Sequence, residues 1–196
     1  QMKILFVGLP RNLSYEIRHG RLTSLSGPAT WTVDGLPNIT VTKPLKMFPN
    51  SLRPGRSVNE VLERKHVRKL ARQLGLNKPI LWLNPHYAVH MAGRMGEAAV
   101  IYDITDDWTQ LSQSPRARQT VVEQDQLLCR RANAVIVCSQ RLYDLKFGMT
   151  SSLHLIPNGV DAAHYRAVTE PGDLPPAAQA WKKPVLGYTG SIHPDR

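Results

Sequence analysis

Short apolar runs alternate with longer amphipathic stretches along most of this chain. A continuous apolar run that ends at glycine, proline or polar residues predicts a buried strand. Such runs occupy residues 4–7, 80–83, 98–103, 134–138 and 153–156. Strands that are apolar throughout, rather than at every second position, are typical of parallel sheets. The pattern predicts an α/β protein with a Rossmann-like, mostly parallel sheet and helices on both of its faces.

The amphipathic stretches predict the helices between these strands. Expected helices cover residues 57–74, 115–132 and 140–146, with a short one at 91–95. Ser57 and Glu60 match a capping box, and Gly75 follows the first helix. One apolar stripe is expected along that helix, with basic residues pointing outward over the rest of its surface. The stripe consists of Val61, Leu62, Leu70, Ala71 and Leu74, and the basic residues are Arg64, Lys65, Arg68, Lys69 and Arg72. Ser114 and Ser139 are the N-cap candidates of the next two helices.

The amino-terminal quarter has a different pattern. Residues 11–25 are polar and predict a partly helical segment, whereas residues 30–33 and 39–41 are rich in β-forming side chains. Asp34-Gly35 between these two pieces is a turn signal. The proline-containing stretch 43–56 predicts a loop.

The net positive charge of the chain indicates what kind of partner it binds. Among 196 residues, Lys and Arg total 25 and Asp and Glu total 15, giving a formal net charge of +10. This balance indicates an anionic partner, which could be nucleic acid, anionic lipid headgroups or a phosphorylated substrate. No apolar run approaches the roughly 20 residues of a membrane span. Cys129 and Cys138 lack metal-ligand spacing and are interpreted as reduced core residues.

The densest group of reactive side chains follows the strand at 98–103. Ligands of open parallel sheets bind beyond the carboxyl ends of the strands. Asp103, Asp106 and Asp107 lie there beside Trp108. Carboxylates can accept hydrogen bonds from sugar hydroxyls or take a proton from one, and tryptophan can stack on a sugar ring. Alternatively, Asp106 or Asp107 caps the next helix and Asp103 pairs with a basic neighbour.

Two further loops carry candidates. His86 follows another strand and is a candidate base or hydroxyl ligand. Ser139 and Arg141 could offer a hydroxyl group and a positive charge to an anion, although Ser139 could equally be only a helix cap. Neither phosphate-binding glycine motif, G-x-G-x-x-G or G-x-x-x-x-G-K-[ST], occurs in the chain. No metal site is predicted.

Four motifs in order resemble one enzyme family. They are VIYDITDD, LLCRRANAVIVCS, LIPNGVDAAHY and GYTGSI, within residues 80–192. Together they resemble the group 1, family four-like glycosyltransferases of the GT-B fold, closest to bacterial members that make exopolysaccharide or cell-wall polymers. The resemblance implies transfer of a sugar from a nucleotide diphosphate sugar to a saccharide or lipid-linked acceptor, without a cofactor.

The resemblance also implies a domain plan. Residues 1–161 would form the acceptor domain, closed by Asn158, which is also a substrate-binding candidate. Residues 162–183 would be a linker, and residues 184–196 would open a truncated donor domain with a further buried strand that starts at residue 184. Thr189, Gly190 and Ser191 would approach the donor diphosphate, and the fragment alone would be inactive. In relatives a strand and a helix usually precede a strand like 3–7, which would then be the family's second.

Catalytic roles are expected for Asp106, Asp107 and His86, and substrate contacts for Asp103, Trp108, Ser139, Arg141 and Asn158. Two alternatives remain: a nucleotide-sugar epimerase of the same fold, and a non-catalytic basic module that binds nucleic acid or a membrane. Nucleic acid is disfavoured because the basic helix 57–74 has no interleaved aromatic residues. The expected location is cytoplasmic, with an anionic inner membrane surface as a second partner of that helix.

Overall fold

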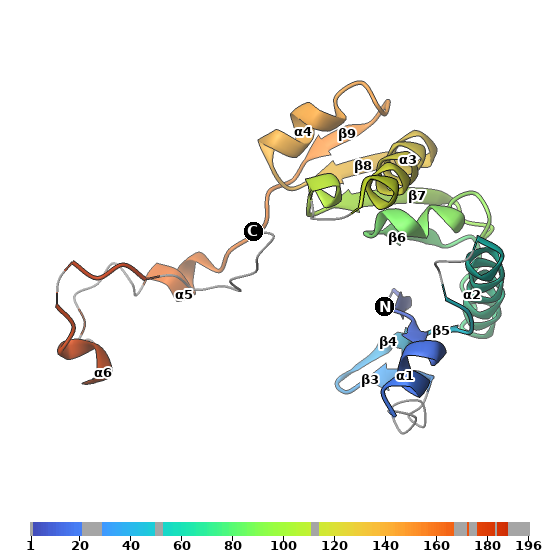
Figure 1. Ribbon diagram of the computed structural model, residues 1–196, viewed down its shortest axis with the longest axis horizontal. Coiled ribbons are helices and arrows are strands. Elements are labelled where there is room, and N and C mark those ends of the chain that lie inside the picture. The colour runs from blue at the N-terminus through green and yellow to red at the C-terminus, as the bar shows by residue number, and fades with distance from the viewer. Residues whose placement is uncertain are drawn as a thin grey trace.

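The computed structural model describes residues 2–20, 29–49, 53–110, 114–166, 172, 176–182 and 184–187. Within these ranges the chain forms a four-stranded sheet, a three-stranded sheet and a small two-stranded sheet. Figure 1 shows the four-stranded sheet with its helices at the top, the amino-terminal strands below it, α2 at the right between the two, and a tail leading away.

The four-stranded sheet is parallel throughout. Its strands lie in the order β6 (Ile80–Leu83), β7 (Ala99–Ile104), β8 (Ala134–Val137) and β9 (Leu153–Leu155). The connections are the 3₁₀ helix η2 (His86–His90), α3 (Pro115–Arg131) and α4 (Gln140–Lys146). This arrangement confirms the predicted α/β class and its Rossmann-like, mostly parallel sheet, as well as the caps at Ser114 and Ser139.

The main core lies between this sheet and its helices. Burial alternates along β7 and β8, so that one face of the sheet carries the buried side chains. Tyr102, Val135 and Val137 from the strands pack with Leu128 and Cys129 from α3, and all five are at most 1% exposed. Burial raises the pKa of Cys129 to about 12, which is consistent with the predicted reduced core cysteine.

The amino-terminal sheet is smaller and mixed. Its order is β1 (Ile4–Val7), β4 (Leu36–Thr42) and β3 (Thr30–Val33), with β1 and β4 parallel and β3 antiparallel to β4. The predicted turn is confirmed, since Gly35 has φ +76°, a conformation that favours glycine. Strands β2 (Arg11–Asn12) and β5 (Leu45–Lys46) form a second parallel pair, and α1 (Leu13–Arg18) follows β2.

Helix α2 (Arg53–Gln73) joins the two regions, and its start was predicted wrongly. Ser57 lies inside the helix rather than at a cap, and Glu60 pairs with Arg56 at 3.7 Å instead of closing a capping box. The residues before Ser57 can enter the helix because Pro54 lies in its first turn, where proline's missing N–H leaves no bond unmade. A Cβ on Gly55 would lie 2.9 Å from Phe48, so glycine permits the close approach here.

Two other expectations about this part of the chain were wrong. Residues 91–95 form turns, and the short helix is η2, one turn earlier. The apolar stripe predicted for α2 included Val61 and Leu62, but both are 40% exposed. The helix instead buries Asn59 and Val67, because its neighbours on that side are loops with backbone groups for Asn59 to bind.

The tail after β9 extends away from the sheets (Figure 1). It contains α5 (Ala162–Arg166), which Asp161 caps, and α6 (Pro176–Gln179). Residues 184–187, expected to begin a buried strand, are exposed and form no strand. No described strand pairs with them. A strand needs a neighbouring strand to bond its backbone N–H and C=O groups, so these residues belong to none of the described sheets.

Candidate functional site

A polar hollow lies at the carboxyl edge of the four-stranded sheet, where the loops after β7 and β8 meet. Its volume is about 480 Å³ and it is open to solvent. Its walls are Thr105, Asp106, Asp107 and Gln110 from the first loop, and Ser139, Arg141 and Leu142 from the second. Four predicted site residues, Asp106, Asp107, Ser139 and Arg141, are therefore brought together. These residues meet because β7 and β8 are neighbouring parallel strands, whose carboxyl ends lie at the same edge of the sheet.

Asp107 has one carboxylate oxygen engaged within its own loop. Its Oδ1 accepts hydrogen bonds from the backbone N–H of Thr109 at 3.1 Å and from the Thr109 hydroxyl at 2.5 Å. It thereby caps the 3₁₀ helix η3 (Trp108–Gln110), the alternative role expected for this residue. Its Oδ2 has no hydrogen-bond partner among the described residues. Asp106 is exposed at the rim of the hollow.

Ser139 and Arg141 form the opposite wall. The Ser139 hydroxyl accepts from the backbone N–H of Leu142 at 3.4 Å, so this residue both caps α4 and lines the hollow. Arg141 lies in the first turn of α4 and is exposed. The hollow therefore combines two carboxylates, a guanidinium group and three neutral hydrogen-bonding side chains. This set suits a ligand with several hydroxyl groups and a negative charge.

His86 and Trp108 lie together beside this hollow. Their ring centroids are 6.1 Å apart, and Tyr87 stacks edge-on against His86 at 5.7 Å. Burial lowers the pKa of His86, and the negative charge of Asp125 partly opposes this shift. The imidazole is therefore neutral at pH 7, as a base must be. Its Nδ1 has no hydrogen-bond partner within the described parts of the chain.

Asp103 and Asn158 do not line the hollow. Asp103 projects from the opposite side of β7 to the buried Tyr102, and its Oδ2 accepts from the indole N–H of Trp82 at 3.0 Å. The partner of Asp103 is therefore the indole of Trp82 and not the basic side chain that was expected. Asn158 is exposed in the segment after β9. Thr189, Gly190 and Ser191 lie outside the described residues.

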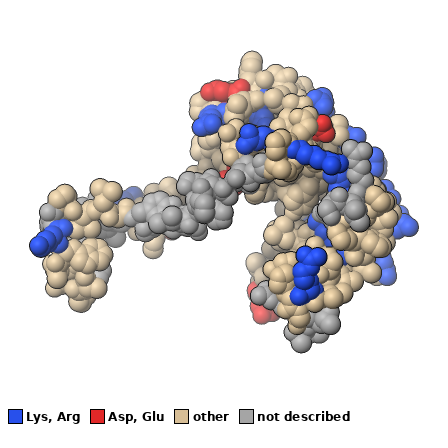
Figure 2. All heavy atoms as spheres, in the orientation of Figure 1, with Lys and Arg blue, Asp and Glu red and all other residues tan. Residues whose placement is uncertain are grey.

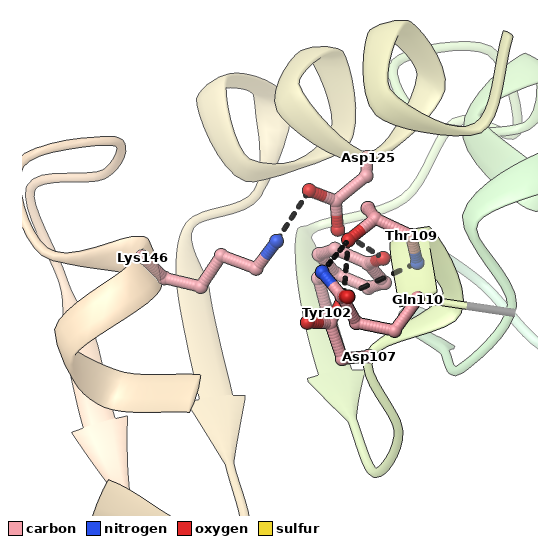
Figure 3. Close-up of polar contacts among 6 residues, drawn as sticks. All are labelled: Tyr102, Asp107, Thr109, Gln110, Asp125 and Lys146. Atoms are coloured by element: carbon pink, nitrogen blue, oxygen red, sulfur yellow. Dashed lines mark hydrogen bonds and ion pairs between the residues drawn. The ribbon is translucent and has the colours of Figure 1, made fainter. Parts of the chain in front are cut away.

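A buried polar network supports the hollow from below. Lys146 on α4 pairs with Asp125 Oδ2 on α3 at 2.5 Å, and the Tyr102 hydroxyl on β7 donates to Asp125 Oδ1 at 2.9 Å. Figure 3 shows Lys146 reaching across to Asp125, whose carboxylate also accepts the hydrogen bond from the Tyr102 hydroxyl. Burial and the charge of Asp125 raise the pKa of Tyr102. The network therefore connects β7 and α4, the elements next to the two walls, through Asp125 on α3.

Sequence analysis missed Thr105, Gln110 and Asn84. Asn84 follows β6, and its side-chain amide donates to the backbone oxygen of Asp103 at 3.0 Å and lies 3.4 Å from the Thr105 hydroxyl. The Cys138 thiol donates to the backbone oxygen of Thr105 at 3.2 Å. Thr105 and Asn84 directly follow strands, which was the available signal, but neutral residues at that position are too common to indicate a site.

Basic side chains are prominent on the surface. Figure 2 shows Lys and Arg along the edge formed by α2, with fewer Asp and Glu on the same face. Lys65, Lys69 and Arg72 are exposed there. Arg64 is partly buried and donates to the backbone oxygen of His90 at 3.2 Å, whereas Arg68 is exposed and donates to the backbone oxygen of Arg94. None of the described helices is both long and apolar enough to cross a membrane.

Comparison with known proteins gave one solved structure. It is a sucrose-phosphate synthase chain from Thermosynechococcus elongatus, with 13% sequence identity and a TM-score of 0.49. The likeness covers 86% of this chain and 100% of that chain. No family model and no curated protein matches the chain.

Proposed function

We propose that this chain carries the acceptor-binding domain of a GT-B glycosyltransferase, which moves a sugar from a nucleotide diphosphate sugar to an acceptor hydroxyl. The observation that carries the proposal is the hollow that brings together Asp106, Asp107, Ser139 and Arg141. A parallel sheet with a polar site at its carboxyl edge is the arrangement on which nucleotide and sugar chemistry is commonly built.

The hollow supplies groups for binding and for proton transfer. Asp106 and Asp107 would accept hydrogen bonds from acceptor hydroxyl groups, and Arg141 would bind a negatively charged part of the substrate. If the reaction inverts the anomeric centre, Asp106, Asp107 or the neutral His86 would take the proton of the attacking hydroxyl. If it retains the configuration, the same groups would orient the acceptor.

The donor would be held mainly by a second domain. Thr189, Gly190 and Ser191 remain candidates for contact with the donor diphosphate, and residues 1–196 alone are expected to be inactive. No cofactor is required in this scheme, because the diphosphate charge would be met by backbone amides and basic side chains.

The exposed bases of α2 support a membrane-borne acceptor as part of this proposal. Lys65, Lys69 and Arg72 would lie against anionic headgroups on the inner face of the membrane, where each base contributes about 1 kcal/mol. Vesicles containing phosphatidylserine should bind the protein at low salt and release it at high salt. Charge reversal of all three residues should abolish binding, and equal binding to neutral vesicles would contradict this part.

Activity assays of the full-length polypeptide test the catalytic proposal. With a panel of nucleotide sugars and acceptors, Asp106→Asn or Asp107→Asn should lower kcat/KM by about ten- to a thousand-fold while leaving the fold intact. Glu123→Gln is the matched control. Glu123 is an exposed carboxylate on α3, and its replacement by glutamine removes one negative charge, as the aspartate changes do. It should leave kcat/KM unchanged.

The products separate this proposal from its alternatives. A glycosylated acceptor supports it, whereas a changed sugar on the nucleotide without any acceptor would identify an epimerase. Wild-type kinetics in both aspartate variants would leave Asp107 as a helix cap only. Turnover by residues 1–196 equal to that of the full-length polypeptide would contradict the two-domain scheme.

A further inference from the structure

A second hollow lies at the amino edge of the four-stranded sheet, opposite the edge that carries the candidate site. Its volume is about 520 Å³, and it is bounded by the loop that leads into β7, by the first residues of that strand and by the residues between α3 and β8. The six residues of β7 separate the two edges by roughly 20 Å. The two hollows are therefore distinct, and this one is large enough for a small organic ligand.

Small residues create the space in this second hollow. Gly93 and Gly96 have φ values of +77° and +72°, a conformation that favours glycine, and a Cβ on either would meet no atom within 4 Å apart from its chain neighbours. The other small lining residues are Ala92, Ala98 and Ala99. None of these residues reaches across the hollow, so its chemistry is set by the polar side chains around it.

Two arginines line the hollow from different elements. Arg94 belongs to the loop before β7, and its backbone oxygen accepts a hydrogen bond from Arg68 on α2. Arg131 is the last residue of α3, and one of its guanidinium nitrogens donates to the backbone oxygen of Val89 at 3.4 Å. Both lining arginines are exposed. A guanidinium group carries five N–H donors, so Arg131 keeps donors for a ligand.

The carboxylate that lines the hollow is engaged by its own loop. Glu97 Oε1 accepts from the backbone N–H of Gly93 at 2.5 Å, and its Oε2 accepts from that of Met95 at 2.8 Å. These bonds hold the loop in its turned conformation. Among the described residues that line the hollow, two carry a positive charge and Glu97 carries the single negative charge. The lining is therefore positive overall.

Asn133 adds a neutral donor to the lining. Its backbone N–H donates to the Val100 oxygen at 2.8 Å, and its Oδ1 accepts from the Val100 N–H, also at 2.8 Å. These bonds fix Asn133 against β7 and use its side-chain oxygen, which leaves the Nδ2 hydrogens for a ligand. The polar side chains of the hollow thus offer donors, whereas their acceptors are already used. An anion that accepts hydrogen bonds matches such a lining.

We propose that this hollow binds a small phosphate monoester, with its phosphate group between Arg94 and Arg131 and beside the Asn133 amide. Two guanidinium groups match the nearly two negative charges of a phosphate monoester at pH 7 better than the one charge of a carboxylate. The hollow is larger than a phosphate group, so the organic part of the ester would lie over Gly93 and Gly96. This proposal does not depend on the proposed glycosyltransferase activity.

Binding of glycerol 3-phosphate to the 196-residue chain tests the proposal, with inorganic phosphate and glycerol as companion probes. Titration calorimetry at low salt should show saturable binding of glycerol 3-phosphate, weaker binding of inorganic phosphate and no binding of glycerol. The backbone amide NMR signals of Gly93, Gly96 and Asn133 should shift in the same titration. Absence of binding by the ester, or equally tight binding of inorganic phosphate, would overturn the proposal.

Three variants in the hollow locate the binding site. Arg94→Gln and Arg131→Gln each remove one positive charge and should weaken glycerol 3-phosphate binding about tenfold or more, the scale of a lost charge-assisted hydrogen bond. Asn133→Asp keeps the oxygen that accepts from Val100 and adds a negative charge. It should therefore abolish binding while β7 stays in place. Unchanged binding in all three variants would contradict the proposal.

Two arginine variants elsewhere are the matched controls. Arg118→Gln removes an exposed charge near the start of α3, and Arg141→Gln removes the arginine of the hollow at the carboxyl edge. Both should leave glycerol 3-phosphate binding unchanged. Loss of binding in Arg141→Gln alone would place the phosphate at the carboxyl edge and overturn the proposal. So would an equal loss in Arg118→Gln and Arg94→Gln, because binding would then depend only on net charge.

Discussion

The two larger sheets of the described structure differ greatly in how well their strands are buried. In the four-stranded sheet, Tyr102, Val135 and Val137 are fully buried. In the three-stranded sheet, only Thr42 among the described strand residues is buried, and Phe6 is 58% exposed. The difference follows from neighbours, because η2, α3 and α4 pack against the first sheet, whereas α2 touches only one side of the second.

This contrast teaches that an apolar strand must pack against other elements to be buried, and that its own sequence does not show whether those elements are present. The four-stranded sheet contains its cover in its own crossover helices, so it can fold as a unit around one core. The strands β1, β4 and β3 depend on elements outside their own connections. Local stability should therefore be concentrated in the four-stranded sheet.

The largest loss of stability is expected when the buried Lys146–Asp125 pair is broken. Lys146→Met leaves the Asp125 carboxylate buried with only the Tyr102 hydroxyl as a partner, which should cost about 3–5 kcal/mol of unfolding free energy. Urea unfolding followed by circular dichroism measures it. The double variant Asp125→Asn with Lys146→Met should be more stable than the single one. If Lys146→Met lowers the unfolding free energy by less than the double variant does, the Lys146–Asp125 pair does not stabilise the four-stranded sheet.

A matched pair of truncations compares the two regions directly. Leu128→Ala removes a fully buried side chain and should cost about 2–5 kcal/mol, whereas Phe6→Ala in residues 1–196 should change stability by no more than about 0.5 kcal/mol. Both values come from the same urea titrations. A similar cost for the two changes would remove the distinction between the sheets.

The sequence was sufficient to predict the parallel sheet and much of the hollow, for a physical reason. Continuous apolar runs mark parallel strands, and parallel strands bring the residues that follow them to one edge, so Asp106, Asp107, Ser139 and Arg141 could be grouped without coordinates. The start of α2 could not be predicted, because its first turn depends on how Gly55 packs against Phe48. Asp103 was misplaced because it points away from the hollow and bonds Trp82 on the neighbouring strand, a contact that depends on how β6 and β7 pair.

The pairing of Asp125 with Lys146 was also invisible in the sequence. Both residues occur in helices whose charged positions are otherwise exposed, and nothing in their spacing distinguishes them. Only the relative placement of α3 and α4 brings them together. Contacts between elements that are distant in sequence are thus the part of the site that required a structure.

The smallest expected effect is a pH dependence to which both regions contribute. Burial lowers the pKa of His66, beside Thr42 and α2, and that of His86, beside the hollow, below the usual value of 6.5. Between the folded and unfolded pKa values the unfolded chain binds more protons, so stability should be complete above about pH 6.5 and fall as the pH drops below it. Thermal unfolding at pH 7.5 and 5.5 should show this loss, with each of His66→Gln and His86→Gln removing part of it. His164→Gln, an exposed change in the tail, should leave the dependence intact. A dependence that survives the loss of both buried rings would mean that neither region holds its histidine neutral.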